Sequence, residues 1–148
     1  MLGLYETVEF NTFGIHTENK GFYSKYGHYP CFQIACDDPE EVLGKDEIIT
    51  HAKKATVIFN YPLSGEFKFE FKNSQGKITR REFALFIQST YHNIYNNEST
   101  KPVGNIPGID NRLPSDGPYG IWGHYIEDLV IEGVQHIGDG VYVLHIGS

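Results

Sequence analysis

The sequence lacks several features that would assign it to a familiar class of protein. It has two cysteines, one methionine and one tryptophan among 148 residues. So few cysteines exclude the disulfide framework of a small secreted protein. The apolar stretches are short and interrupted by polar residues, whereas a membrane-spanning helix needs about 20 consecutive apolar residues. We therefore expect neither a disulfide bond nor a membrane partner.

Basic residues are also scarce. Lys and Arg number 12 and Asp and Glu number 19, which gives a formal net charge of −7. A phosphate backbone is repelled by such a chain unless the basic residues cluster tightly. The charge balance therefore predicts no nucleic-acid partner.

The N-terminus has neither the basic segment nor the apolar segment of a secretory signal, so a cytoplasmic location with reduced cysteines is expected. Four residues separate Cys31 from Cys36. This spacing differs from the redox motif CxxC, and no second cysteine pair is present to complete a zinc site. Both thiols are interpreted as small buried apolar groups, and the sequence predicts no cofactor.

Aromatic residues, in contrast, are abundant. Tyr and Phe each occur 10 times, and 40% of the residues are hydrophobic, so large rings are expected to fill the core. A chain of 148 residues has the usual size of one domain. Residues 1–148 are therefore expected to form a single domain.

Two β-hairpins are predicted, over residues 55–72 and 129–146. In the first, residues 56–61 are β-branched and aromatic, Pro-Leu-Ser-Gly follows as a turn, and residues 66–72 alternate charged residues with phenylalanine. This alternation directs the three phenylalanines to the core and the charged side chains to water. The second hairpin reverses at a Gly-Asp-Gly turn.

One amphipathic helix is predicted from Arg80 to about Asn96. Thr79 stands as its N-cap, and Glu82, three residues later, completes a capping box. Apolar residues then recur at spacings of three and four, so that one stripe should lie on the sheet: Phe83, Phe86, Ile87, Tyr91, Ile94 and Tyr95. The expected fold is α+β, with antiparallel β-hairpins forming one sheet and a single long amphipathic helix packed across it.

This fold also predicts a core. Its expected members are the apolar residues of the hairpins and the helix: Val57, Phe59, Phe67, Phe69, Phe71, Phe83, Phe86, Ile87, Tyr91, Ile94, Leu129, Ile131, Val143 and Leu144. Arg80 and Arg81 occupy the end of the helix where its dipole disfavours cations. A solvated surface beside a neighbouring acid is the simpler interpretation of this pair, and a specific partner is the alternative.

Two further segments have local signals. Residues 1–36 contain glycines and tyrosines that suggest short strands joined by turns. Within residues 38–44, Asp38 fits the N-cap of a single helical turn, Pro39 its first position and Gly44 its end.

Between residues 97 and 120 the periodic pattern stops, and prolines and glycines punctuate the chain. This segment is far longer than the usual connection of about five residues. Long ordered loops in compact domains are commonly functional. The loop and the aromatic residues that follow it, up to residue 125, are therefore the predicted functional surface.

Trp122 lies between two glycines, and Tyr119 and Tyr125 are close to it in the sequence. Together these three rings fit an exposed aromatic platform for a protein partner. Because tryptophan is highly buried on average, a plug in the hydrophobic core is the competing interpretation of Trp122. The two interpretations predict opposite exposures.

Asp110, Asn111 and Arg112 form a polar group within the long loop. An acid, an amide and a planar guanidinium can together recognise a carboxylate, a phosphate or a sugar. They can equally hold the loop itself through turns and bonds to backbone carbonyls.

His124 and Asp128 would share one face if residues 122–128 were helical. The pair suits a metal site or a histidine oriented by a carboxylate. It supplies at most two of the three or four ligands that a metal needs. A loop histidine bonded to nearby backbone is the simpler interpretation.

Residues 79–128 combine a capped helix, a Pro/Gly loop, the sequence GPYGIWGH and an acidic pair. This block, about a third of the chain, resembles uncharacterised proteins of large DNA viruses that infect algae and amoebae. The resemblance carries no known activity. It implies a viral or virus-exchanged origin and adds a virion-associated location as the second expectation.

The chain contains no GxSxG elbow, phosphate-binding P-loop or dinucleotide-binding GxGxxG motif. The first functional hypothesis is a non-catalytic binding or assembly protein that uses residues 97–125 to bind a protein partner or to self-associate. The alternative is a small hydrolase or lyase, with or without a metal. In it, His124 would be the general base or ligand, Asp128 would orient it and Arg112 would bind an anionic substrate.

Overall fold

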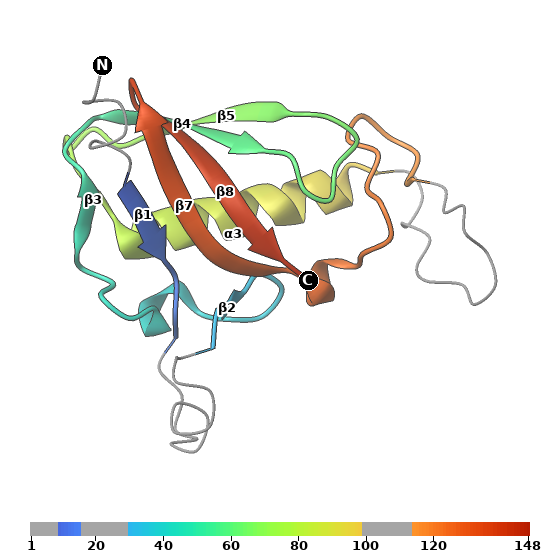
Figure 1. The fold of residues 1–148 in the computed structure, drawn as a ribbon, viewed down its shortest axis with the longest axis horizontal. Helices are drawn as coiled ribbons and strands as arrows, with labels where there is room; N and C mark the ends of the chain where they lie inside the picture. Colours follow the sequence, from blue (N-terminus) through green and yellow to red (C-terminus); the bar gives the residue numbers. More distant parts are fainter. Residues whose placement is uncertain (1–8, 16–29, 99–113) are drawn as a thin grey trace.

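The computed structural model describes residues 9–15, 30–98 and 114–148 of the chain (Figure 1). In chain order the elements, with η marking a 3-10 turn, are β1 (Glu9–Thr12), β2 (Phe32–Gln33), η1 (Pro39–Glu41), β3 (Ile48–Thr50), β4 (Lys54–Phe59), β5 (Phe67–Lys72), β6 (Ile78–Thr79), α3 (Arg80–Asn96), η2 (Ile126–Asp128), β7 (Val130–Gly138) and β8 (Val141–Gly147). The α+β prediction is confirmed, since the 17-residue helix α3 packs across a mostly antiparallel six-stranded sheet. A separate two-stranded sheet, formed by β3 and β6, adjoins it.

Both predicted hairpins are present in the main sheet, whose order is β1-β7-β8-β4-β5 with β2 also paired to β7 (Figure 1). β4 pairs with β5 and β7 pairs with β8, each in antiparallel register. The two hairpins join through a parallel pairing of β4 with β8, in which Thr56 is opposite Val141. This parallel junction at the centre of the sheet was not part of the expected fold.

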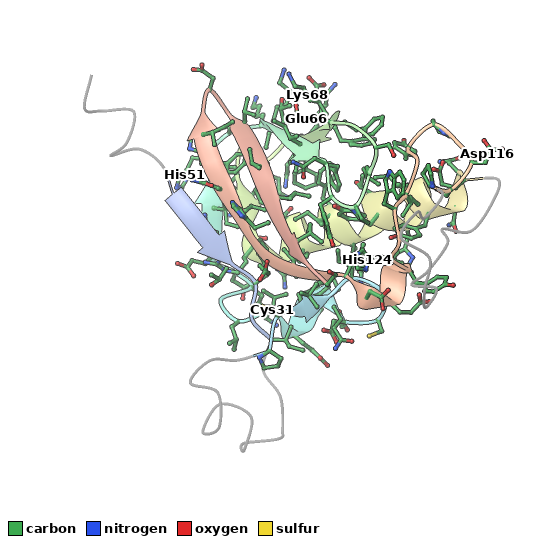
Figure 2. The ribbon with its side chains drawn as sticks, turned by 45° about the vertical axis from the view of Figure 1, so that its right-hand side comes forward. Cys31, His51, Glu66, Lys68, Asp116 and His124 are labelled. Atoms are coloured by element: carbon green, nitrogen blue, oxygen red, sulfur yellow. The ribbon has the colours of Figure 1, made fainter. Side chains whose placement is uncertain are left out.

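The alternation in β5 has the predicted consequence. Its three phenylalanines are half-buried against the core, whereas Glu66 and Lys68 project outward at the edge of the molecule (Figure 2). On the outer face, Lys54 of β4 forms an ion pair of 3.4 Å with Glu70 of β5. The sheet therefore presents an aromatic face to α3 and a charged face to water.

Helix α3 has the predicted bounds and the predicted cap. The Thr79 hydroxyl accepts a hydrogen bond from the Glu82 amide at 3.2 Å, and the Thr79 amide donates to the Glu82 carboxylate at 2.9 Å. The apolar stripe faces the sheet, with five of its residues buried and Phe86 half-buried. The short turn η1 is also capped as expected, since the Asp38 side chain accepts from the Glu40 amide.

The expected position of Val143 in the core was wrong. In β8 the side chains of Tyr142 and Leu144 are buried, so Val143 between them points to the other face of the sheet. In β7 the register shifts between Ile131 and Gly133. This irregularity lets Ile131 and Val134 both face the core although they are three residues apart.

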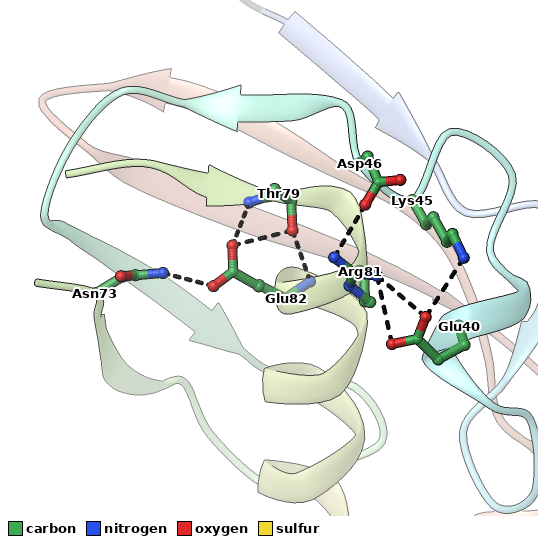
Figure 3. A network of polar contacts seen from close by, with 7 residues as sticks. All are labelled: Glu40, Lys45, Asp46, Asn73, Thr79, Arg81 and Glu82. Carbon is green, nitrogen blue, oxygen red and sulfur yellow. Dashed lines mark hydrogen bonds and ion pairs between the residues drawn. The ribbon is translucent and has the colours of Figure 1, made fainter. Parts of the chain in front are cut away.

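Arg80 is not the solvated surface residue that the sequence suggested. The residue is only 9% exposed, and its side chain donates to the Thr12 carbonyl at 2.9 Å and forms an ion pair of 2.9 Å with Glu47. Arg81 fits the surface interpretation better, because its guanidinium contacts the acids Glu40 and Asp46 at 3.0 and 2.9 Å (Figure 3).

The two cysteines are free thiols. The expectation that both are buried was wrong: Cys31 is half-buried, and Cys36 is exposed and donates to the Gln33 side chain at 3.1 Å. Burial raises the pKa of the Cys31 thiol, and the nearby charge of Glu132 raises it further.

Within the described residues, no helix is both long and apolar enough to cross a membrane.

Candidate functional site

The predicted functional surface gathers several elements at the C-terminal end of α3. Two tyrosines of the helix fix the neighbouring backbone: the Tyr91 hydroxyl donates to the Tyr61 carbonyl at 2.6 Å, and the Tyr95 hydroxyl donates to the His124 carbonyl at 2.9 Å. Both phenols are protonated donors at neutral pH, and burial raises the pKa of each further above its ordinary value of 10.0. The chain after β4 and the segment before η2 are thus tied to one helix.

Glu98, just beyond the end of α3, organises the end of the long loop. Its carboxylate accepts hydrogen bonds from the Ser115 hydroxyl at 2.8 Å and from the Gly120 amide at 2.7 Å. Ser115 is buried, and its hydroxyl also accepts from the Ile121 amide at 2.7 Å. A Cβ atom at Gly117 would overlap the Glu98 carboxylate, which explains the glycine there. Sequence reasoning missed Glu98, because its partners lie 17 to 22 residues further along the chain.

The same segment is fastened to the turn between β4 and β5. The Ser64 amide donates to the Tyr119 carbonyl at 2.9 Å, and the Ser64 hydroxyl donates to the Gly120 carbonyl at 2.6 Å. The Trp122 amide donates to the Pro62 carbonyl at 2.7 Å. Residues 114–122 are therefore held on two sides, by the helix end and by this turn.

Three aromatic side chains stand exposed on this fixed backbone. We call Tyr61, Trp122 and Tyr125 the aromatic surface; they are 39%, 43% and 48% exposed. The interpretation of Trp122 as a core plug was wrong. Gly120 and Gly123 both have φ of +60°, a conformation that favours glycine, and between these turns Ile121 is buried while Trp122 points outward.

The exposed rings are not the same three that the sequence predicted. Tyr119 is half-buried and packs on Phe67 with ring centroids 4.8 Å apart, so it supports the loop instead of extending the aromatic surface. Tyr61, which the sequence reasoning missed, takes its place. It lies 63 residues before His124 and only the fold brings the two together, so no local pattern could have identified it.

His124 lies beside the turn η2 (Figure 2) and contacts Tyr61 of the aromatic surface. Its Nε2 atom is 2.8 Å from the Tyr61 hydroxyl, which is itself 3.0 Å from the Ser148 hydroxyl. Its Nδ1 atom is 3.8 Å from the Asp128 carboxylate, beyond hydrogen-bonding distance. The imidazole therefore has a side-chain partner in Tyr61, contrary to the expected bond to backbone.

The assumption that residues 122–128 are helical was wrong, because only Ile126–Asp128 forms a 3-10 turn. Asp128 approaches His124 for another reason: its carboxylate turns back to accept from the Tyr125 amide at 2.9 Å. Among residues 9–15, 30–98 and 114–148, no group of three or more potential metal ligands occurs. His124 and Asp128 thus have no third ligand in that part of the chain.

Other candidate sites lie elsewhere. Asp110, Asn111 and Arg112 fall outside the described residues, so no geometry links them to His124. An open cavity of about 510 Å³ lies between α3 and the end of β5, lined in part by Phe71, Glu82, Leu85 and Phe86. None of the aromatic surface and neither His124 nor Asp128 lines it.

Models of protein families give no match to this chain, and comparisons with curated proteins and with solved structures give none either. The resemblance of residues 79–128 to viral proteins stays a prediction. The geometry of the aromatic surface and of His124 is therefore the basis for inferring the function.

Proposed function

We propose that this protein is a non-catalytic binding or assembly protein and that the aromatic surface is its protein-interaction site. The observation that carries the proposal is the exposure of Tyr61, Trp122 and Tyr125 on segments that meet. The Trp122 amide donates to the Pro62 carbonyl next to Tyr61, and the Tyr61 hydroxyl contacts His124 next to Tyr125. Tyr and Trp are enriched at protein interfaces and dominate their binding energy. The surface comprises the described end of the predicted 97–125 segment together with Tyr61.

The fixed backbone supports this proposal. The segments that bear the three rings are held by hydrogen bonds. Tyr91, Tyr95 and Ser64 donate to the backbone of these segments, and Glu98 accepts from it. A surface that is already ordered loses less conformational entropy when a partner binds. In a multi-copy assembly, such as the viral particle that the resemblance leaves open, the partner would be another copy or another component.

Self-association is the first form of the proposal to test. Light scattering after size-exclusion chromatography should show an oligomer that dissociates in Trp122→Ala, with circular dichroism confirming that the variant is folded. Leu85→Ala is the matched control, because Leu85 is 52% exposed but lines the cavity between α3 and β5, away from the aromatic surface. The control should remain an oligomer.

A monomeric wild type would leave a different protein as the partner. A peptide library displayed on phage should then yield sequences that bind the wild type and Leu85→Ala but not Trp122→Ala. If the protein is monomeric and no peptide distinguishes Trp122→Ala from the wild type, the proposal is wrong.

One observation favours a second candidate, a small hydrolase or lyase. His124 lies between the Asp128 carboxylate and the Tyr61 hydroxyl, an order suited to a general base with an orienting acid. Arg112 would bind the anionic substrate in this hypothesis. Turnover of aryl ester or aryl phosphate substrates that is lost in His124→Ala, and kept in Leu85→Ala, would move this candidate to first place.

A further inference from the structure

We infer that the aromatic surface binds a positively charged side chain, an arginine or a lysine, that a partner protein presents. This inference deepens the proposed function and rests on it. It names the chemistry of the partner that the surroundings of Tyr61, Trp122 and Tyr125 select.

The distribution of charge along the chain is the first argument. Residues 82–98 and 114–148, which supply most of the site, contain no lysine or arginine. The second of these ranges contains five acidic residues, and two of them, Glu127 and Asp128, follow Tyr125 within three positions. A partner with a positive charge would therefore meet no like charge from these two parts of the chain.

The position of the acids is the second argument. Glu127 and Asp128 follow Tyr125 within η2 and are exposed. Burial raises the pKa of the Tyr95 phenol, and the negative charges of Asp128 and Glu127 raise it further. The Asp128 carboxylate lies 3.8 Å from the His124 Nδ1 atom and accepts from the Tyr125 amide at 2.9 Å, so one acid lies directly beside both residues.

The chemistry of the rings is the third argument. The face of an aromatic ring attracts a cation, and tryptophan does so most strongly. A guanidinium can stack on such a face while its edge binds a carboxylate through two parallel hydrogen bonds. Trp122 and Tyr125 are exposed, and Glu127 and Asp128 carry exposed carboxylates two and three residues after Tyr125. An acidic segment would be repelled by the same groups.

The test uses two synthetic pentapeptides, acetyl-Gly-Arg-Gly-Arg-Gly-amide and the same peptide with citrulline in place of arginine. Citrulline keeps the shape of arginine but has no charge. Fluorescence of Trp122, the only tryptophan, and the amide spectrum of the full chain report binding. We expect the arginine peptide to bind about tenfold more tightly than the citrulline peptide, as one cation–π contact with a carboxylate implies.

Substitutions locate the effect. Glu127→Gln and Asp128→Asn should each weaken the arginine peptide several-fold and leave the citrulline peptide unchanged. Asp139→Asn removes the same charge from the far end of β7, in the turn to β8, and should change neither peptide. Trp122→Leu should abolish the preference for arginine.

The outcomes separate this inference from the proposed function. Equal binding of the two peptides overturns the cation inference and leaves the proposed interaction surface in place. The same holds if neither peptide binds but assembly of the protein still depends on Trp122. If neither peptide binds and no assembly or selected peptide depends on Trp122, the proposed function fails as well.

Discussion

The two ends of α3 are held by different kinds of interaction. At the N-terminal end, charged side chains bind one another. Arg80 pairs with Glu47, and Figure 3 shows that Arg81 pairs with Glu40 and Asp46. At the C-terminal end, the phenols of Tyr91 and Tyr95 donate to backbone carbonyls, and the exposed ring of Tyr61 contacts His124.

The difference distinguishes structural residues from candidate binding residues. Cations near a helix N-terminus are disfavoured by the helix dipole, and here acids from η1 and the chain after it compensate for them. The charged side chains at this end therefore pair with one another within the chain. At the other end the phenols of Tyr91 and Tyr95 bind backbone carbonyls, and the side chains of Trp122 and Tyr125 remain exposed to a partner.

The largest expected effect on stability is at the N-terminal end. Arg80→Ala should lower the free energy of unfolding by about 2 to 3 kcal/mol, because it removes a buried charge-assisted network and leaves the Thr12 carbonyl without its donor. Urea denaturation measures the change. Arg81→Ala is the control and should cost much less, since its acid partners are exposed. Equal losses in the two variants would contradict the contrast between a buried and a surface arginine.

The next effect is at the opposite end. Glu98→Gln should destabilise residues 115–121 locally by about 1 to 2 kcal/mol, because a carboxylate that accepts several hydrogen bonds becomes a neutral amide. Hydrogen exchange at the Gly120 amide should become about tenfold faster. The Ile87 amide in the middle of α3 provides the internal reference, and its acceleration to the same degree would indicate global rather than local destabilisation.

Alkaline pH should affect the C-terminal end through its tyrosines. Burial raises the pKa of Tyr91 and Tyr95 above the ordinary value of 10.0, so the folded protein keeps protons that the unfolded chain releases. The two protonated phenols stabilise the folded protein fully below about pH 10. Above that pH the free energy of unfolding falls, by at most about 1.4 kcal/mol per pH unit for each tyrosine. Urea denaturation of Tyr91→Phe at pH 9 to 11 should show a shallower decline than the wild type, and an identical decline would refute the assignment.

The smallest expected effect on stability is that of Trp122→Ala. Because Trp122 is 43% exposed, the free energy of unfolding should change by about 0.5 kcal/mol or less. Its neighbour Ile121 is fully buried, so Ile121→Ala should cost several times more. Thermal denaturation compares the two variants. A large loss in Trp122→Ala would mean that the ring stabilises the fold and would weaken its assignment to binding.

The elements that could be predicted from the sequence are those with a local pattern. Alternating phenylalanines identified β5, a spacing of three and four residues identified the buried stripe of α3, and the pair Thr79 and Glu82 marked its first turn. Each signal depends on residues close in the chain. The parallel pairing of β4 with β8 joins Thr56 to Val141, and no local pattern reports such a contact.

The candidate site shows the same division. The sequence singled out the region of Trp122 and His124, because glycines, rings and acids are concentrated there. It did not predict the exposure of Trp122, which depends on positive φ angles at Gly120 and Gly123. Nor did it predict Tyr61, which reaches His124 only after the sheet has formed. Asp110, Asn111 and Arg112 stay predictions.

The parallel junction between β4 and β8 also constrains the order in which the protein folds. Each hairpin closes over a short stretch of chain, which is fast, whereas the junction joins strands that are far apart in the sequence and forms slowly. Until β8 has been synthesised, β4 has one edge with unpaired backbone groups, and such an edge invites pairing with another chain. The strand that completes the centre of the sheet is thus the one that covers this edge of β4.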